Sequence, residues 1–220
     1  LRAVLRGRLV DAVQEALGAD VLDPSKLTLG FARRFAGYKR AGLLFTQPER
    51  LAAILDRGVQ VVFAGKAHPQ DTEGQEMLAE VIRWSKEPRF AGRVVFVPGY
   101  DPDWGRLLTQ GSDVWLNTPR RPREASGTSG QKAALNGNPN LSVLDGWWPE
   151  GWDGDNGWAI PGTGDVEDAL ALYTLLEDKV IPAFADPDAW ARMMAHVLAT
   201  CVPVFNTDRM LRDYCRLVYD

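Results

Sequence analysis

The sequence predicts an α/β fold in which helices cover both faces of a doubly wound parallel sheet. Apolar runs at residues 27–31, 59–64, 93–97 and 114–117 have the composition of buried strands. Helical patterns separate these runs, so each strand is followed by a crossover long enough to return the chain in the same direction. At 220 residues, the chain can bury a substantial core within one domain.

The first half of the chain alternates helix and strand. Residues 1–17 carry apolar side chains at helical spacing, at Leu5, Leu9, Val13 and Leu17. A second helical pattern covers residues 42–55, although Pro48 interrupts it. Residues 71–84 form a charged helical pattern, and residues 101–108 follow an Asp-Pro helix-start signal.

The second half is expected to add two short strands, at residues 141–144 and 158–160. Helices are expected at residues 131–135, 165–180, 188–198 and 207–219. Asp165 and Thr207 are interpreted as caps of their helices. The whole chain is thus predicted to be one Rossmann-like domain, residues 1–220, with a C-terminal helical tail.

Composition limits the function. The net charge of −4 gives no reason to expect nucleic acid or a membrane surface as a partner. With no signal peptide, no apolar run of membrane-spanning length and only two cysteines, Cys201 and Cys215, the sequence favours a cytoplasmic protein without a disulfide framework. The chain begins at Leu1 within a helical pattern, so we expect it to be a piece of a longer protein.

Residues 122–137 contain the strongest functional signal. Gly127, Thr128, Ser129 and Gly130 form a small-residue turn ahead of the expected helix, a combination that suits an anion. Lys132 would lie in the first turn of that helix, where a cation is disfavoured unless an anion is bound or the lysine forms a Schiff base. An ordinary helix-capping loop with a solvated Lys132 fits the same residues.

Basic residues follow the first two strands. The loop after residues 27–31 holds Arg33, Arg34, Lys39 and Arg40, and Lys66 follows residues 59–64. Because the carboxyl ends of parallel strands share one edge, we expect these cations and Glu124 to meet in one crevice. The crevice would suit one or two phosphates and a polyhydroxy ligand. His68 is interpreted as loop structure.

Half of the eight tryptophans cluster at Trp147, Trp148, Trp152 and Trp158. They could stack against a sugar, but burial is the commoner use of large aromatic side chains, so packing is favoured. Residues 153–164 fail as a calcium loop because Gly157 and Gly164 occupy ligand positions. We expect no metal site.

Three motifs resemble the carboxyl-terminal half of the α-glucan phosphorylases, which act on glycogen, starch or maltodextrin. They read RRFAGYKR at 33–40, FAGKAHP at 63–69 and EASGTSGQKAALNG at 124–137. The resemblance covers about residues 27–160, with a plausible tail in FNTDRM at 205–210. Departures from the animal enzymes, such as Ser129-Gly-Gln131 in place of Gly-Asn-Met, resemble the shorter bacterial branch.

The resemblance implies the second Rossmann-like domain of a GT-B glycosyltransferase that binds pyridoxal 5′-phosphate. The implied reaction is reversible phosphorolysis of a terminal α-1,4-linked glucose, giving glucose 1-phosphate. An α-glucan and inorganic phosphate are the implied partners, and a homodimer is compatible with the family. Without an amino-terminal domain, the isolated fragment is expected to be inactive.

The same resemblance assigns roles to individual residues. Catalytic roles fall on Lys132, Arg34, Lys39 and Glu124. The cofactor would contact Lys132, Arg33, Thr128, Ser129 and Tyr100. The glucose unit and the substrate phosphate would contact Tyr38, Glu124, Ala125, Ser126, Gly127, Arg34 and Lys39.

Two alternatives stay open. A sugar-nucleotide-dependent glucan synthase has the same architecture, but those enzymes carry a second glutamate where this sequence has Lys132, and a lysine cannot accept hydrogen bonds from a ribose. The other alternative is a non-catalytic carbohydrate-binding fragment that uses the tryptophan cluster.

Overall fold

The structure is a computed structural model that describes residues 2–219. Within these residues, six parallel strands form one sheet in the order β3-β2-β1-β4-β5-β6. The strands are β1 (Leu27–Ala32), β2 (Val59–Ala64), β3 (Val94–Val97), β4 (Val114–Asn117), β5 (Asn140–Val143) and β6 (Gly157–Ile160). The predicted doubly wound, Rossmann-like α/β fold is confirmed, and the strand order reverses between β1 and β4.

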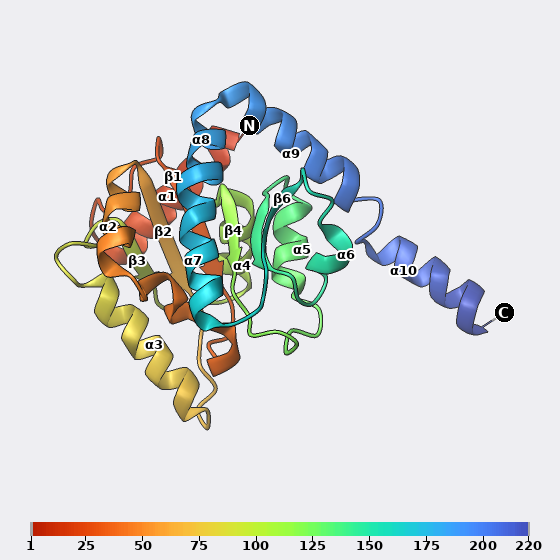
Figure 1. Cartoon of the computed structure of the whole chain (residues 1–220), viewed down its shortest axis with the longest axis horizontal. Helices are drawn as coiled ribbons and strands as arrows, with labels where there is room; N and C mark the ends of the chain where they lie inside the picture. Colours follow the sequence, from red (N-terminus) through yellow and green to blue (C-terminus); the bar gives the residue numbers. More distant parts are fainter. Residues whose placement is uncertain (1, 220) are drawn as a thin grey trace.

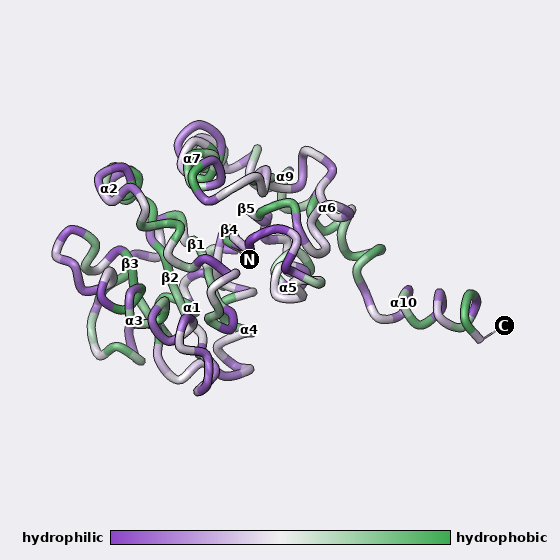
Figure 2. The backbone as a smooth tube through the Cα atoms, turned by 60° about the horizontal axis from the view of Figure 1, so that its bottom comes forward, coloured by the Kyte–Doolittle hydropathy of each residue, from purple (hydrophilic) through white to green (hydrophobic). Residues whose placement is uncertain are grey.

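Helices cover both faces of the sheet (Figure 1). One face is covered by α1 (Arg2–Leu17) and α4 (Pro102–Gly111), and the other by α2 (Pro48–Asp56), α3 (Thr72–Ser85) and α7 (Asp165–Leu175). Figure 2 shows α2 and α7 on the opposite side of the strands from α1 and α4. Both β1 and β2 are buried at every position, as expected of strands covered on both faces.

The remaining helices lie in the second half of the chain. They are α5 (Thr128–Ala134), α6 (Trp148–Gly151), α8 (Ile181–Ala185), α9 (Pro187–Cys201) and α10 (Thr207–Tyr214). A π-helical turn, Leu176–Val180, joins α7 to α8, and another, Cys215–Tyr219, extends α10. The last helix extends away from the sheet and buries none of its residues (Figure 1).

Three expectations about helix boundaries were wrong. Residues 42–55 do not form one helix: a 3₁₀ turn, Ala41–Phe45, precedes α2, which starts at Pro48 because proline suits the first helical position. The caps also fall one residue earlier than expected, at Gly164 for α7 and Asn206 for α10. The third error concerns α5, which begins at Thr128 rather than Gln131 because Gly127 takes the left-handed conformation before it (φ 83°).

Two findings bear on the composition. In the described range, no helix has both the length and the apolar character needed to cross a membrane. Residues 2–219 also contain no group of three or more His, Cys, Asp or Glu side chains arranged to hold a metal ion, and both cysteines are free.

Candidate functional site

A cavity of about 1010 Å³ opens at the carboxyl ends of β1, β3 and β4, beside the point where the strand order reverses. It is lined by five cationic side chains, those of Arg33, Arg34, Lys39, Arg106 and Lys132, and by two carboxylates, Asp101 and Glu124. Asp101 is committed to capping α4, since its side chain accepts a hydrogen bond from the Trp104 N–H. The cavity is therefore strongly positive in a chain of net charge −4, which suits an anionic ligand.

Glu124 is the polar centre of this cavity and lies in the loop between β4 and α5. Its Oε1 accepts a hydrogen bond from Lys39 Nζ at 2.7 Å, and its Oε2 accepts one from Arg33 Nη1 at 3.2 Å. All three residues are less than 10% exposed. Such buried, charge-assisted contacts hold the carboxylate in a fixed place and leave positive charge in excess around it.

Arg33 retains donor capacity for a ligand. Its Nη2 lies 3.5 Å from Ser129 Oγ, and among the described residues its buried Nε has no hydrogen-bond partner. Burial lowers the pKa of the guanidinium, while the Glu124 carboxylate opposes that shift. An arginine keeps its charge even so. The Arg33 guanidinium and the hydroxyl-bearing residues Thr128 and Ser129 line the same cavity, and together they supply donors of the kind that bind a phosphate group.

Lys132 lies on α5 with its side chain exposed at the wall of the cavity. Within residues 2–219 it forms no ion pair. The expectation that Lys132 lies in the first turn of α5 was wrong. The helix begins at Thr128, four residues before the lysine, so Lys132 lies in its last turn. The helix dipole therefore gives no reason for a lysine at position 132. An accessible amine in a cavity suited to phosphate still fits a cofactor that carries both an aldehyde and a phosphate.

Aromatic side chains complete the wall. Tyr38 lies under Lys39, with Nζ 4.6 Å from the ring centroid. Tyr100 is half-buried between Arg33 and α4, and burial raises the pKa of its hydroxyl. The cavity thus brings together all the residues to which the resemblance assigns a role except Ala125 and Ser126, whose side chains do not line it.

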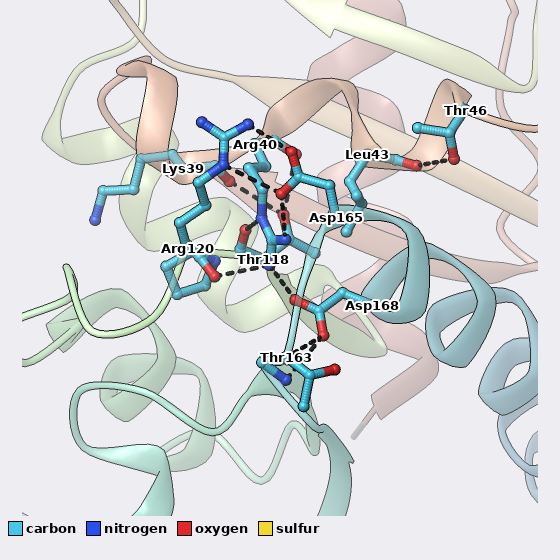
Figure 3. Close-up of polar contacts among 11 residues, drawn as sticks. Lys39, Arg40, Leu43, Thr46, Thr118, Arg120, Thr163, Asp165 and Asp168 are labelled. Atoms are coloured by element: carbon cyan, nitrogen blue, oxygen red, sulfur yellow. Dashed lines mark hydrogen bonds and ion pairs between the residues drawn. The ribbon is translucent and has the colours of Figure 1, made fainter.

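Two of the expected cations lie elsewhere. Arg40 does not line the cavity, and its guanidinium lies in a partly buried cluster with residues at the N-terminus of α7 (Figure 3). There it pairs with Asp165 at 2.9 Å and with Asp168 at 2.7 Å, and it also donates to the carbonyl oxygens of Thr118 and Pro119. Lys66 is exposed and does not line the cavity. The prediction of one shared crevice was wrong for both residues.

The structure also identifies site residues that the sequence did not. Asp101, just before α4, and Arg106, on α4, line the cavity. Asp145 does not line the cavity, but its side chain accepts a hydrogen bond from the backbone N–H of Glu124. Asp145 follows the carboxyl end of β5 by two residues, so the criterion that selected Arg33 would have found it.

The tryptophan cluster serves packing, as predicted, at three of its four positions. Trp147, Trp148 and Trp158 are buried, whereas Trp152 is 36% exposed. The Trp147 ring packs against Phe205 with centroids 4.9 Å apart. Buried rings cannot form a sugar platform, so the cluster gives no support to a separate carbohydrate site. His68 is a loop residue, as expected, and its Nδ1 accepts a hydrogen bond from the Gln70 N–H.

Known proteins resemble this chain closely, although no model of a protein family matches it. A glycogen phosphorylase of Aquifex aeolicus is 45% identical over 212 residues, which is 90% of this chain and 31% of that protein. A glycogen phosphorylase of Mycobacterium bovis is 45% identical, covering 91% of this chain and 25% of that protein. A maltodextrin phosphorylase of Thermococcus litoralis is 47% identical, covering 90% and 25%.

These relatives confirm the resemblance that the three motifs predict. The chain spans less than a third of the length of each of these three relatives.

Proposed function

We propose that this chain, a relative of the α-glucan phosphorylases over about 90% of its length, forms the part of such an enzyme that binds pyridoxal 5′-phosphate and the substrate phosphate. The observation that carries the proposal is the combination, in one cavity, of the Glu124–Arg33–Lys39 cluster with the accessible amine of Lys132. The proposed reaction is phosphorolysis of the terminal α-1,4-linked glucose of glycogen or maltodextrin.

The cofactor would be held by Lys132 through its aldehyde carbon and by Arg33, Thr128 and Ser129 through its phosphate, with Tyr100 beside its ring. Support for this assignment comes from the unpaired Nε of Arg33, from the Ser129 hydroxyl 3.5 Å from Arg33 Nη2, and from Thr128 in the wall of the same cavity. When bound, pyridoxal 5′-phosphate supplies a phosphate group that can share a proton with a second phosphate or stabilise its charge.

The substrate phosphate would be bound by Arg34 and Lys39. Arg34 is exposed at the cavity wall, so it can rotate towards an incoming anion. Lys39 is held between Glu124 and the Tyr38 ring, so its ammonium is already in place. These cations would stabilise the phosphate as it approaches the electron-poor sugar carbon of the transition state.

Glu124 and Tyr38 would bind hydroxyls of the glucose unit, with the backbone of residues 125–127 beside them. The Glu124 carboxylate oxygens can accept hydrogen bonds from these hydroxyls. The remaining part of the glucose site and the glucan channel would come from the rest of a longer protein.

The test is an absorbance spectrum of the full-length protein with pyridoxal 5′-phosphate, before and after borohydride reduction, followed by peptide mapping. We expect a reduced adduct at Lys132 and release of glucose 1-phosphate from maltodextrin and inorganic phosphate. Absence of the adduct would contradict the proposal. Glucose transfer from a sugar nucleotide instead would favour the synthase alternative.

A further inference from the structure

A short turn after β5 holds the loop that carries Glu124. The backbone N–H of Glu124 donates a hydrogen bond to Asp145 Oδ2 at 2.8 Å. Two residues further on, the Trp147 N–H donates to the carbonyl oxygen of Ser126 at 2.8 Å. These bonds bracket residues 124–126, which lie in no helix or strand. The turn at residues 145–147 therefore holds the backbone that carries the site carboxylate.

Asp145 is firmly attached to the sheet. Its own N–H donates to the carbonyl oxygen of Val143, the last residue of β5, at 2.8 Å, and its carbonyl oxygen accepts from the Trp148 N–H at 3.3 Å. The residue is 7% exposed, and its side chain does not line the cavity. Asp145 can therefore act on a ligand through Glu124, the cavity-lining residue to which its carboxylate is bonded.

The turn also fits closely against the loop. Gly146 has a left-handed backbone (φ 61°), and a Cβ atom added to it would lie 2.5 Å from the Ser126 carbonyl oxygen and 2.9 Å from Glu124 Cγ. No side chain fits in this space. Glycine at position 146 thus allows the Asp145 carboxylate to reach the Glu124 N–H.

We propose that Asp145 is a positioning residue, which fixes the backbone of Glu124 and so keeps the Glu124 carboxylate within reach of Arg33, Lys39 and a sugar hydroxyl. A hydrogen bond to an ionised acceptor is stronger than one to a neutral acceptor. When phosphates bind to Arg33 and Lys39, the side-chain contacts of Glu124 weaken, and the backbone contact to Asp145 still holds the residue. The inference rests on the proposed function only in treating Glu124 as a ligand contact.

Hydrogen–deuterium exchange at the Glu124 amide tests the geometry without any ligand. It is measured on the full-length protein by mass spectrometry with electron-transfer fragmentation. In Asp145→Ala we expect exchange to be faster by about tenfold or more, because the amide loses a charged acceptor. Asp145→Asn keeps an acceptor oxygen and should restore most of the protection. Equal exchange in the wild type and Asp145→Ala would overturn the proposal.

A second pair of variants disturbs the loop by steric contact. Gly146→Ala should displace residues 124–126 and speed exchange at Glu124. Gly18→Ala is the matched control, because Gly18 has nearly the same backbone (φ 63°) but nothing within 4 Å of an added Cβ atom. If Asp145→Ala does not fold, this pair and Asp145→Asn decide the question. Protection at Glu124 that is unchanged in Gly146→Ala counts against the proposal.

Kinetics of the full-length enzyme test the consequence. In Asp145→Ala, kcat/KM for maltodextrin phosphorolysis should fall by about tenfold or more and recover in Asp145→Asn, as expected when a transition-state contact is displaced. A loss of thermal stability with unchanged kcat/KM would mean a merely structural role and overturn the proposal. If the wild type shows no phosphorolysis but the exchange pattern is as expected, the proposed function fails and the positioning role of Asp145 stands.

Discussion

Lys39 and Arg40 are adjacent and almost equally buried, at 7% and 5% exposure, yet they belong to two opposite kinds of charged cluster. Lys39 joins Arg33 at Glu124, where cations outnumber carboxylates. Arg40 joins Arg120 at Asp165 and Asp168, where the charges balance. Figure 3 shows the side chains of Lys39 and Arg40 pointing away from each other.

The two clusters differ in the donors they leave unused. Each guanidinium nitrogen of Arg40 has a hydrogen-bond partner: Nε donates to Thr118, Nη1 to Asp165, and Nη2 to Pro119 and Asp168. In the part of the chain that the structure describes, Arg33 Nε has no such partner. A satisfied, charge-balanced cluster stabilises the fold, whereas an unsatisfied cluster with excess positive charge is suited to binding an anion.

The largest expected effect is on the cavity side. Replacing Lys132 with alanine removes the amine that would hold the cofactor, so phosphorolysis by the full-length protein should fall by more than about a thousandfold, equivalent to about 4 kcal/mol. Because the side chain is exposed, the melting temperature of the cofactor-free protein should not change. Lys66→Ala, an exposed lysine outside the cavity, is the control and should keep full activity. Undiminished activity of Lys132→Ala without added cofactor would remove Lys132 from the site.

The balanced cluster should respond in stability. Arg40→Ala leaves the buried Asp168 without its arginine partner, and breaking a buried pair costs about 3–5 kcal/mol. Urea unfolding measures the loss. Arg120→Ala is the matched control, since Arg120 is 44% exposed and, among residues 2–219, pairs only with the half-exposed Asp165, so its cost should stay below about 1 kcal/mol. Equal costs for the two variants would mean that Arg40 is not the centre of the cluster.

The sequence predicted the sheet well because its signals are local. The apolar runs at β1 and β2 can be read without knowing their neighbours, and the motif at 124–137 has a long fixed spacing. The different directions of Lys39 and Arg40 could not be predicted. They depend on a left-handed backbone at Arg40 (φ 49°), an uncommon conformation for a residue other than glycine, and on an α7 partner more than a hundred residues away.

The start of α5 and the role of Asp145 were missed for a similar reason. The helix start depends on the conformation of Gly127, which the sequence allows but does not require. The contact of Asp145 with Glu124 joins the loop that follows β4 to the loop that follows β5. It can be inferred only when the pairing of β4 with β5 is known.

An intermediate effect is expected at Arg34, which lines the cavity but is exposed. Arg34→Ala should weaken the binding of inorganic phosphate to the full-length, cofactor-loaded enzyme by about tenfold to a hundredfold, the contribution of a hydrogen bond to a charged group. Isothermal titration calorimetry measures this. Stability should change by less than about 0.5 kcal/mol. Arg83→Ala, which removes another exposed arginine, on α3, should leave phosphate binding unchanged. Equal weakening in both variants would indicate general electrostatics instead of a site.

The smallest effect concerns the pH dependence of the balanced cluster. Hydrogen bonds from Arg120 and Arg40 lower the pKa of Asp165 from 3.8 to about 2. A depressed folded-state pKa stabilises the protein above the unfolded-state pKa, and this contribution disappears as the pH falls through the folded value. Since the Asp165 side chain is 48% exposed, solvent screening limits the contribution to about 1 kcal/mol.

Asp165→Asn isolates this contribution. The difference in unfolding free energy between the wild type and Asp165→Asn should be constant above about pH 4 and should shrink between pH 4 and pH 2. Urea unfolding across this pH range measures the difference, and Asp155→Asn, an exposed aspartate with no arginine partner in the described residues, serves as the control. A difference that does not vary with pH would show that Asp165 keeps an ordinary pKa, so that the half-exposed edge of the balanced cluster adds no electrostatic stability and only the buried pair of Arg40 and Asp168 stabilises it.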